Sequence, residues 1–455
     1  MKLMIKDMNK IVLLAFVAMF GSGYAQTDGE GTYSLQQCLD YALENHTSVK
    51  NAKLDFESSE AKVKETVSIG LPQVNGKVDL IDNLKVQSQF VPANAFEPTA
   101  PANLVMPLAF GVQYSSNASV TATQLIFDGS YLVGLQAAKV YKELYEKSIV
   151  QSKVELAEKV SKAYYAVLVT EERFALVQKN KTLIGKLYED TKAMKEAGFA
   201  DNVSLQRIEV SKNNLDVEIS KLESLVAISY ALLKFQMGMP QQESIVLSGK
   251  LDTVIEEMVA IGDLNSGVEN RIEFKMLGVQ KQLMELDIKN YKSRALPSLG
   301  AFGTMGASIG SLEFGDMLKF NDWRNYSMIG LSLEVPVFSS MQRKHRIAQA
   351  KISSEKVSNN LEQLEQSIEL EQLQSKLTIE NSLKTIEVQK QNMALAEEVY
   401  RVTKIKYDEG MASNYEVIDT ETALKDAQTN YYNALYEAII AKIDYEKATG
   451  NLYNE

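Results

Sequence analysis

ENHTSVK, at Glu44–Lys50, returns as ENRIEFK at Glu269–Lys275, 225 residues later in a chain of 455 residues. Other landmarks repeat at offsets of 225, 212, 212 and 211: Leu71-Pro72 with Leu296-Pro297, Gly198 with Gly410, Gly238 with Gly450, and Phe127 with Phe338. Spaced self-similarity of this kind indicates that one supersecondary unit was duplicated. The sequence therefore predicts two halves of the same design, the first longer by about 14 residues between its proline and phenylalanine landmarks.

The N-terminal segment, residues 1–25, is typical of a secretory signal peptide. Lys2, Lys6 and Lys10 make the start basic, Ile11–Phe20 is apolar, and Gly23-Tyr24-Ala25 supplies small residues at the −3 and −1 cleavage positions. The apolar run is too short to cross a bilayer as a helix, so a retained anchor is the less favoured alternative. We expect this segment to be removed before the protein folds.

Composition excludes several classes of protein. The net charge of −11 argues against nucleic acid or anionic lipid as the main partner. After the signal peptide no run of about 18 apolar residues occurs, so no helical membrane span is predicted. The lone Cys38 cannot form an internal disulfide and is not at the cleavage site, where a lipid-bearing cysteine would stand. We expect it to be a buried or half-buried helix residue.

Neither catalysis nor metal binding is predicted. The chain has two histidines and one cysteine, without metal-ligand spacing and without a phosphate-binding loop, so we expect no metal and no cofactor. Gly306–Gly310 matches the G-x-S-x-G pattern of hydrolases, which requires a strand-to-helix turn and a histidine downstream. Ser308 lies instead in a strand-like segment, and the only later histidine, His345, opens a long helical stretch. We therefore expect the protein not to be an enzyme.

Each half is predicted to contain one very long helix. The first runs from about Ser130 to Ala197 without a proline and would be roughly 100 Å long. Such a helix must belong to a coiled coil, and in both halves apolar residues recur every seven positions. In the first half, Lys181 interrupts the series Val160, Val167, Phe174 and Tyr188. In the second half the series is unbroken: Ile379, Ile386, Met393, Tyr400 and Tyr407. Polar residues at many inward positions leave two interpretations, a weak coiled coil or helices with one packed face and one face toward a water-filled lumen. We favour the second.

Glycines are predicted to turn each long helix back on itself. Gly198 and Gly410 follow helix-like stretches and suit the left-handed position after a helix C-terminus. Asn202 and Asn414 are the predicted caps of the returning helices. The first returning helix, about residues 203–237, is half as long as its partner, and a helix at 34–70, stopped by Pro72, fills the remainder. Together, the lengths of these helices predict a cross-section of four helices, built from helices of unequal length.

The segment between the proline and the long helix of each half alternates with a period of two. The predicted apolar positions are Val74, Val78, Leu80, Val120, Ala122, Ile126, Leu299, Ala301, Met305, Ile309, Ile329, Leu331, Leu333, Val335 and Val337, with small or polar residues between them. Aromatic residues stand at the strand ends: Tyr114, Phe127, Trp323, Tyr326 and Phe338. This pattern is typical of membrane β-strands, although a soluble antiparallel sheet would show the same alternation.

Four membrane strands cannot form a closed sheet by themselves. Backbone groups in lipid must all be paired, so a membrane sheet has to close, and single-chain barrels need at least about eight strands. Two copies would give eight strands around a filled interior, and three would give twelve and a channel. The excess of the first half lies in Val91–Pro107, which we expect to be an external loop.

The doubled plan, the Leu-Pro pair before the strands and the glycine-centred helix turns together resemble the TolC-like outer membrane efflux proteins. The resemblance covers about Thr32 to Tyr453. It implies a mainly α fold with a β-barrel portion: a homotrimer with a twelve-strand barrel in outer membrane lipid, continued by a twelve-helix periplasmic tunnel. It also implies an exit duct for a tripartite efflux pump or a type I secretion system. The implied partners are a periplasmic adaptor protein and an inner-membrane transporter, and no nucleic acid.

The resemblance also divides the chain into segments. Their predicted bounds are 1–25 for the signal peptide, 26–71 for the short helices of the first repeat, 72–128 for the first β-hairpin, 129–238 for the first periplasmic helical hairpin, 239–265 for an equatorial connector, 266–296 for the short helices of the second repeat, 297–338 for the second β-hairpin, and 339–455 for the second helical hairpin and C-terminus.

The resemblance further implies which residues act at the periplasmic tips. Six tip residues would dock the adaptor: Ala197, Gly198, Phe199, Gly410, Met411 and Ala412. Glu416 and Asp419 match carboxylates that ring the tunnel constriction, where three copies would create a field that attracts cations. The alternative for such acidic pairs is a solvated helix face.

The closed-state latch of the family is only partly present in this sequence. Tyr407 matches a latch tyrosine, although at heptad spacing it also suits plain packing. Ala412 and Ser204 replace a basic and an acidic latch residue. A periplasmic coiled-coil adaptor or scaffold without a pore is the alternative function, but it leaves the four alternating strands unexplained.

Overall fold

The computed structural model describes residues 32–96, 98–101, 103–251, 254 and 267–453. The predicted signal peptide lies outside these residues, as does part of the predicted connector at 239–265. The chain divides into two compact units. Unit 1 comprises residues 1–42, 160–259 and 393–432, and unit 2 comprises residues 43–159, 260–392 and 433–455.

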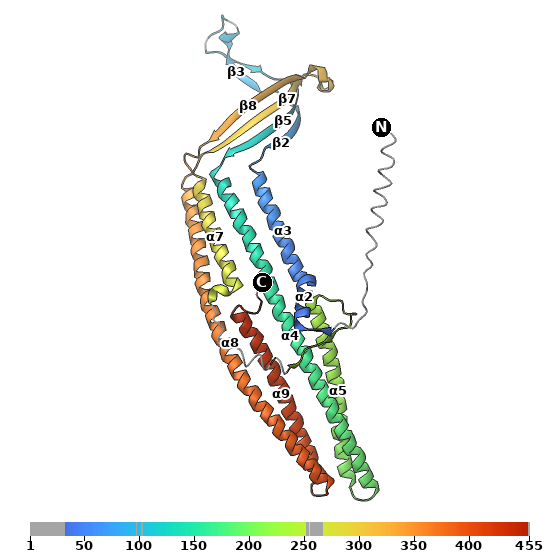
Figure 1. The fold of residues 1–455 in the computed structure, drawn as a ribbon. Coiled ribbons are helices and arrows are strands. Elements are labelled where there is room, and N and C mark those ends of the chain that lie inside the picture. Colours follow the sequence, from blue (N-terminus) through green and yellow to red (C-terminus); the bar gives the residue numbers. More distant parts are fainter. Residues whose placement is uncertain (1–31, 97, 102, 252–253, 255–266, 454–455) are drawn as a thin grey trace, which may run out of the picture. The chain divides into compact units, whose positions relative to one another are not determined.

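Four long helices dominate the described part of the chain (Figure 1). Three of them contribute residues to both units. The four are α4 (Gly129–Glu196), α5 (Asn202–Met237), α8 (Gln342–Asp408) and α9 (Asn414–Ala448). None contains a proline, so no backbone N–H is missing from their hydrogen-bond ladders. No helix among the described residues combines the length and apolar character needed to cross a membrane.

The repeated ENH and ENR stretches mark the start of equivalent helices in the two halves. His46 ends α2 (Leu35–Asn45) and caps α3 (Thr47–Ser68), and its Nδ1 accepts a hydrogen bond from the Ser48 N–H at 3.2 Å. Arg271 occupies the same position before α7 (Ile272–Ser293), after the short 3-10 helix η2 (Val268–Asn270). The single helix predicted for 34–70 is therefore wrong, because the extended backbone of His46, with ψ 135°, interrupts it.

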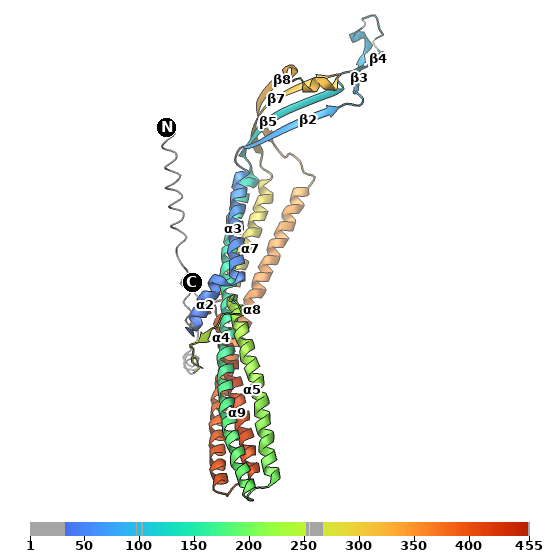
Figure 2. The same cartoon turned by 90° about the vertical axis from the view of Figure 1, so that its right-hand side faces the viewer.

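Unit 2 contains a four-stranded antiparallel sheet in the order β2-β5-β7-β8 (Figure 2). Its strands are β2 (Gln73–Asp82), β5 (Tyr114–Phe127), β7 (Ser298–Ser311) and β8 (Arg324–Glu334). Each repeat supplies one adjacent pair, and the two repeats meet where β5 pairs with β7. Within the described part of the chain, β2 and β8 each pair on one side only, so both edges of the sheet are open.

The register gives the sheet one apolar and one polar face, because cross-strand partners share a face. Ala301 pairs with Leu331 and Gly303 with Ile329, and the two β8 side chains are 73% and 91% exposed. On the other face, the hydroxyls of Thr121 and Thr304 lie 3.0 Å apart. The alternation predicted from the sequence is confirmed within the four strands, but the predicted positions Val335 and Val337 lie beyond the end of β8.

The connections at one end of this sheet differ between the repeats. β2 and β5 are joined through a separate hairpin of β3 (Ser88–Pro92) and β4 (Val105–Ala109), with the 3-10 turn η1 (Ala93–Ala95) after β3. The stretch Val91–Pro107, predicted as a loop, is thus largely the far end of a hairpin. β7 and β8 are joined by two 3-10 turns, η3 (Phe314–Leu318) and η4 (Phe320–Asp322).

Unit 1 also contains a two-stranded parallel sheet, in which β1 (Thr32–Tyr33) pairs with β6 (Val246–Leu247). Cys38 in α2 is fully buried, as predicted, and this burial raises the pKa of its thiol to about 12.

The main core of unit 1 lies among the four long helices. Its buried members are Val177, Ile184, Leu187, Ile208, Leu215, Leu222, Tyr400, Val417 and Leu424. In unit 2, Ile379 packs with Ala441 and Tyr445. The predicted seven-residue seam of α8 is therefore a packed stripe, with Ile379, Ile386 and Tyr400 at most 8% exposed. Lys181, which interrupts the α4 series, is exposed on the surface.

Candidate functional site

The two hairpin turns of unit 1 share one geometry. Gly198 follows α4 with a φ of +82°, and Gly410 follows α8 with a φ of +74°. After α4, the Gly198 N–H donates to the Lys195 carbonyl at 3.0 Å and the Phe199 N–H donates to the Met194 carbonyl at 2.8 Å. This pair of bonds closes the helix end and requires a left-handed residue after the helix, a backbone conformation that glycine adopts without strain.

The second turn repeats these bonds. The Gly410 N–H donates to the Tyr407 carbonyl at 2.9 Å, and the Met411 N–H donates to the Lys406 carbonyl at 2.7 Å. The left-handed glycines predicted from the sequence are thus present at both turns. The residues beside them project into solvent, with Phe199 87% and Met411 73% exposed. Ala197 is also exposed, whereas Ala412 is half-buried.

The helix caps differ from the prediction by one residue. Asp201, not Asn202, caps α5, and its carboxylate accepts a hydrogen bond from the Ser204 N–H at 2.7 Å. Ser413, not Asn414, caps α9, because its Oγ accepts from the Glu416 N–H at 3.3 Å. Asn202 and Asn414 are already the first helical residues, and only a side chain one position earlier can turn back to accept from the free N–H three residues on.

Glu416, predicted at the constriction, also belongs to a capping box. Its carboxylate accepts a hydrogen bond from the Ser413 N–H at 3.4 Å, so the first turn of α9 is closed reciprocally. Asp419 follows one turn later, and both carboxylates are exposed on α9. The two exposed acidic residues are therefore three positions apart in the first two turns of α9.

Tyr407 joins α8 to α4 close to the turns. Its hydroxyl lies 3.0 Å from the Thr191 Oγ1, and the Thr191 side chain is fully buried. The Tyr407 ring is only partly buried and packs on the main core of unit 1. This contact is made within one chain, between helices from the two repeats.

Two further polar contacts cross the core of unit 1. Asn180 Nδ2 on α4 donates to Gln428 Oε1 on α9 at 2.8 Å, and Ser211 Oγ on α5 donates to Glu421 Oε2 on α9 at 3.4 Å. Glu421 is 6% exposed, and its second carboxylate oxygen has no hydrogen-bond partner among the described residues.

Burial raises the pKa of the Glu421 carboxyl above its ordinary range, and Glu218 and Asp426 add to this, while Lys425 and Ser211 oppose it. Beside it, Glu218 of α5 forms ion pairs with Lys425 of α9 and, at 3.7 Å, with Arg173 of α4. Lys181 and Asp216 pair at 2.6 Å between α4 and α5. Sequence reasoning missed this charged layer, although Lys181 interrupting the apolar series was a signal for it.

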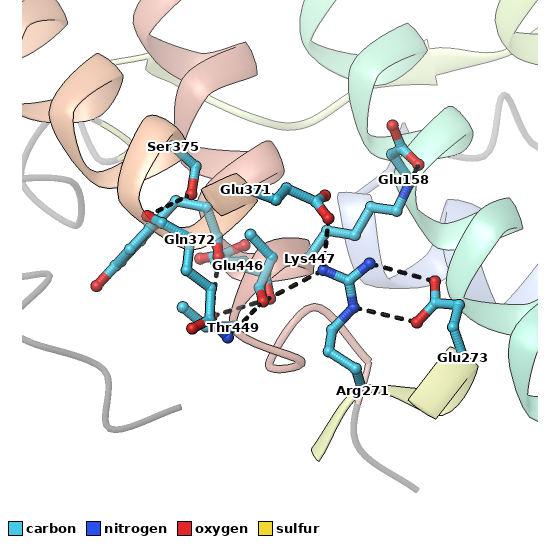
Figure 3. A network of polar contacts seen from close by, with 11 residues as sticks. Glu158, Arg271, Glu273, Glu371, Gln372, Ser375, Glu446, Lys447 and Thr449 are labelled. Carbon is cyan, nitrogen blue, oxygen red and sulfur yellow. Dashed lines mark hydrogen bonds and ion pairs between the residues drawn. The ribbon is translucent and has the colours of Figure 1, made fainter. Parts of the chain in front are cut away.

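A second polar network lies in unit 2 around Arg271, which is 6% exposed (Figure 3). Its guanidinium donates to both carboxylate oxygens of Glu273 at 3.1 and 3.3 Å, to Glu371 at 3.0 Å and to the Ala448 carbonyl at 3.3 Å. Arg271 therefore ties the start of α7 to α8 and to the C-terminal end of α9. Beside it, Lys447 pairs with Glu158 of α4 at 2.7 Å.

The network also shifts the pKa of Glu273. Burial alone would raise it, but the hydrogen bonds and charge of Arg271 outweigh burial and lower it. Sequence reasoning singled out Arg271 only as a repeat landmark. The available signal was its place in the repeated stretch, where the first half has His46.

Metal-ligating side chains are not grouped at either place. In the part of the chain that the structure describes, no three His, Cys, Asp or Glu side chains are placed to hold a metal ion. The two places offer helix turns, a pair of exposed carboxylates and buried polar contacts between helices.

Known proteins match both halves of the chain. A family model described as outer membrane efflux protein matches residues 38–238 and 268–451. TolC of Vibrio cholerae is 21% identical over 342 residues, which are 74% of this chain and 77% of that protein. The probable efflux pump outer membrane protein TtgC of Pseudomonas putida is 20% identical over 431 residues, 93% of this chain and 84% of that protein.

Solved structures share the architecture. The CmeC outer membrane channel of Campylobacter jejuni has a TM-score of 0.71 at 14% identity, over 92% of this chain and 86% of that one. The open state of the MtrE outer membrane channel of Neisseria gonorrhoeae has a TM-score of 0.70 at 18% identity, over 92% and 89%. At these identities the likeness shows the fold: long helical hairpins with four sheet strands.

Proposed function

This chain belongs to the outer membrane efflux protein family, and from this premise we propose that it is the exit duct of a tripartite efflux or type I secretion system, working as a homotrimer. It is an efflux channel of the outer membrane that extends into the periplasm, and it is not an enzyme. The duct conducts passively, because an inner-membrane transporter supplies the energy and a periplasmic adaptor links the two.

The open edges of the four-stranded sheet carry this proposal. An apolar face suits lipid, but unpaired backbone groups on β2 and β8 cannot remain in hydrocarbon. Pairing β2 of one copy with β8 of the next satisfies both edges at once. Three copies supply twelve strands, enough for a water-filled interior lined by the polar face.

Exposed apolar stripes in unit 1 support the same assembly. On α5, Val203, Val210 and Val217 are spaced by sevens and are 52%, 59% and 54% exposed. On α8, Leu395 and Val399 are 66% and 53% exposed. Water-exposed apolar stripes at helical spacing are typical of helices that pack on other copies.

The hairpin turns are proposed as the adaptor-docking tips of the duct. Each turn exposes one large apolar side chain, Phe199 or Met411, to a helical partner. The small residues beside them let that partner approach the backbone: Ala197, Gly198, Gly410 and Ala412. Glu416 and Asp419 are proposed to line the constriction, where six carboxylates from three copies would attract cations. Tyr407 is proposed to hold the closed state through its contact with Thr191, since Ala412 and Ser204 lack the charges of the family latch.

The test is to extract the mature protein from outer membranes with detergent, measure its mass by light scattering, and record conductance in planar bilayers. A trimer that needs detergent and gives discrete conductance steps is expected. A monomer released by a high-salt wash, with no conductance, would overturn the proposal and favour a pore-free periplasmic scaffold.

A further inference from the structure

The β3–β4 hairpin presents an uncovered apolar face to solvent. Phe90 pairs with Pro107 and Pro92 pairs with Val105, so these four side chains share one face of the hairpin. All four residues are exposed, Phe90 by 74% and Val105 by 57%. Two strands alone are marginally stable in water, and an apolar face of this kind marks a contact surface.

The chemistry of this segment restricts what covers it. From Val86 to Gln113 the only charged residue is Glu97. The segment therefore has no cation to bind anionic headgroups or an acidic partner. An apolar protein surface is the occupant that its composition fits.

A second uncovered apolar patch lies at the same end of the sheet. Leu318 and Phe320 are 69% and 78% exposed, at the end of η3 and the start of η4. The turns that hold them are themselves anchored: Met317 is 4% exposed, Trp323 Nε1 donates to the Met317 carbonyl at 3.3 Å, and the rings of Phe320 and Trp323 stack at 6.1 Å.

The strand order brings these two patches together between copies. The register places Asp82, at the end of β2, and Arg324, at the start of β8, at the same end of the sheet. The hairpin is the next element after edge strand β2 (Figure 2). In the same way, η4 is the element that precedes the other edge strand, β8. When β2 of one copy pairs with β8 of the next, the hairpin of the first stands beside η4 of the second.

We propose that the β3–β4 hairpin of each copy packs its apolar face on the Leu318–Phe320 patch of the neighbouring copy, forming a collar at the outer end of the barrel. This inference rests on the proposed assembly and adds a contact that the strands themselves do not make. The first repeat supplies the hairpin, and the second repeat supplies the patch on which the hairpin packs. The extra residues of the first half therefore form a contact between copies.

The test is disulfide trapping in the full-length protein, with Phe90→Cys and Phe320→Cys combined. Native Cys38 is fully buried, so it does not compete. Mild oxidation should give dimer and trimer ladders on non-reducing gels, and each single variant should not. The matched control combines Phe90→Cys with Phe338→Cys, because Phe338 is 81% exposed but follows the opposite end of β8.

Each outcome is decisive. Inter-copy ladders with Phe320→Cys and none with Phe338→Cys support the collar. A protein that remains trimeric by light scattering but forms only intrachain disulfides, keeps free thiols or links to a different protein overturns the collar and leaves the duct intact. A wild-type protein that is never trimeric overturns the proposed function itself.

Discussion

Asn180 and Gln428 stand 248 positions apart in sequence, yet the Asn180 amide donates to the Gln428 side-chain oxygen at 2.8 Å in a buried contact between α4 and α9. Both residues are at most 8% exposed. A buried amide pair inside an apolar seam fixes the register of two helices, because any axial slip leaves both amides unpaired.

Replacing one member of this pair should destabilise the protein more than replacing both. Asn180→Leu alone leaves the Gln428 amide buried without a partner, at a cost of about 1–3 kcal/mol. The double variant with Gln428→Leu should recover most of that loss. Apparent melting temperatures of the two single variants and the double variant, measured by circular dichroism, test this expectation. If the stability losses of the single variants simply add in the double variant, the pairing is contradicted.

Stability should depend on pH through Glu421. Its pKa in the folded protein is raised, so its stabilising contribution is complete below its ordinary value of 4.5 and is lost as pH rises through the raised value. Glu421→Gln should therefore gain stability relative to wild type as pH rises from about 4.5 toward neutrality. Melting temperatures across that interval test this. Glu209→Gln, which removes an exposed carboxylate of α5, is the control. If the melting temperature of Glu421→Gln depends on pH in the same way as that of the wild type, the claim is refuted.

The carboxylates near the second turn should control block by multivalent cations. Glu416→Ala with Asp419→Ala should weaken that block in planar-bilayer conductance, because the field at the constriction is lost. Since Glu416 also caps α9, Glu416→Gln with Asp419→Asn is the matched pair that removes charge and keeps the capping bond. Unchanged block in both pairs would reject the carboxylate ring.

Arg271 should be among the costliest single replacements. Arg271→Met leaves Glu273 and Glu371 without their cationic partner. Because these carboxylates are 29% and 44% exposed, the cost should lie below the about 3–5 kcal/mol of breaking a fully buried pair. Arg271→Lys should retain part of the stability but lose the two-pronged bond to Glu273. Arg401→Met, which breaks an exposed pair with Glu398, is the control and should change the melting temperature little. Equal effects for Arg271→Met and Arg401→Met would refute this role.

Two glycines should respond to alanine in opposite directions. Gly410→Ala forces a side chain into left-handed backbone and should cost about 1–2 kcal/mol. Gly134→Ala, inside α4 with open space around the added Cβ, should stabilise by up to about 1 kcal/mol. Melting temperatures should move down and up respectively, and a shift of the same sign for both would contradict the turn geometry.

Much of the fold could be predicted because its signals are local or periodic. The absence of proline predicted the long helices, and Gly198 and Gly410 predicted their turns. The alternation of Ile329, Leu331 and Leu333 predicted the apolar face of a strand. The helix break at His46 could not be predicted, because a histidine that caps a helix looks like an ordinary helical residue in sequence. The caps at Asp201 and Ser413 were missed by one position, since neighbouring polar residues compete for the same role.

By itself the sequence determined the duplication, the helix and strand periods and the four alternating strands that require further copies, because these depend on neighbouring residues and on the spacing of apolar groups. Only the tertiary structure decided that Arg271 meets Glu371, that Asn180 meets Gln428, and that β5 pairs with β7 to join the repeats. Such partners lie far apart in sequence, and their contacts depend on how whole helices and strands pack, which no local pattern encodes.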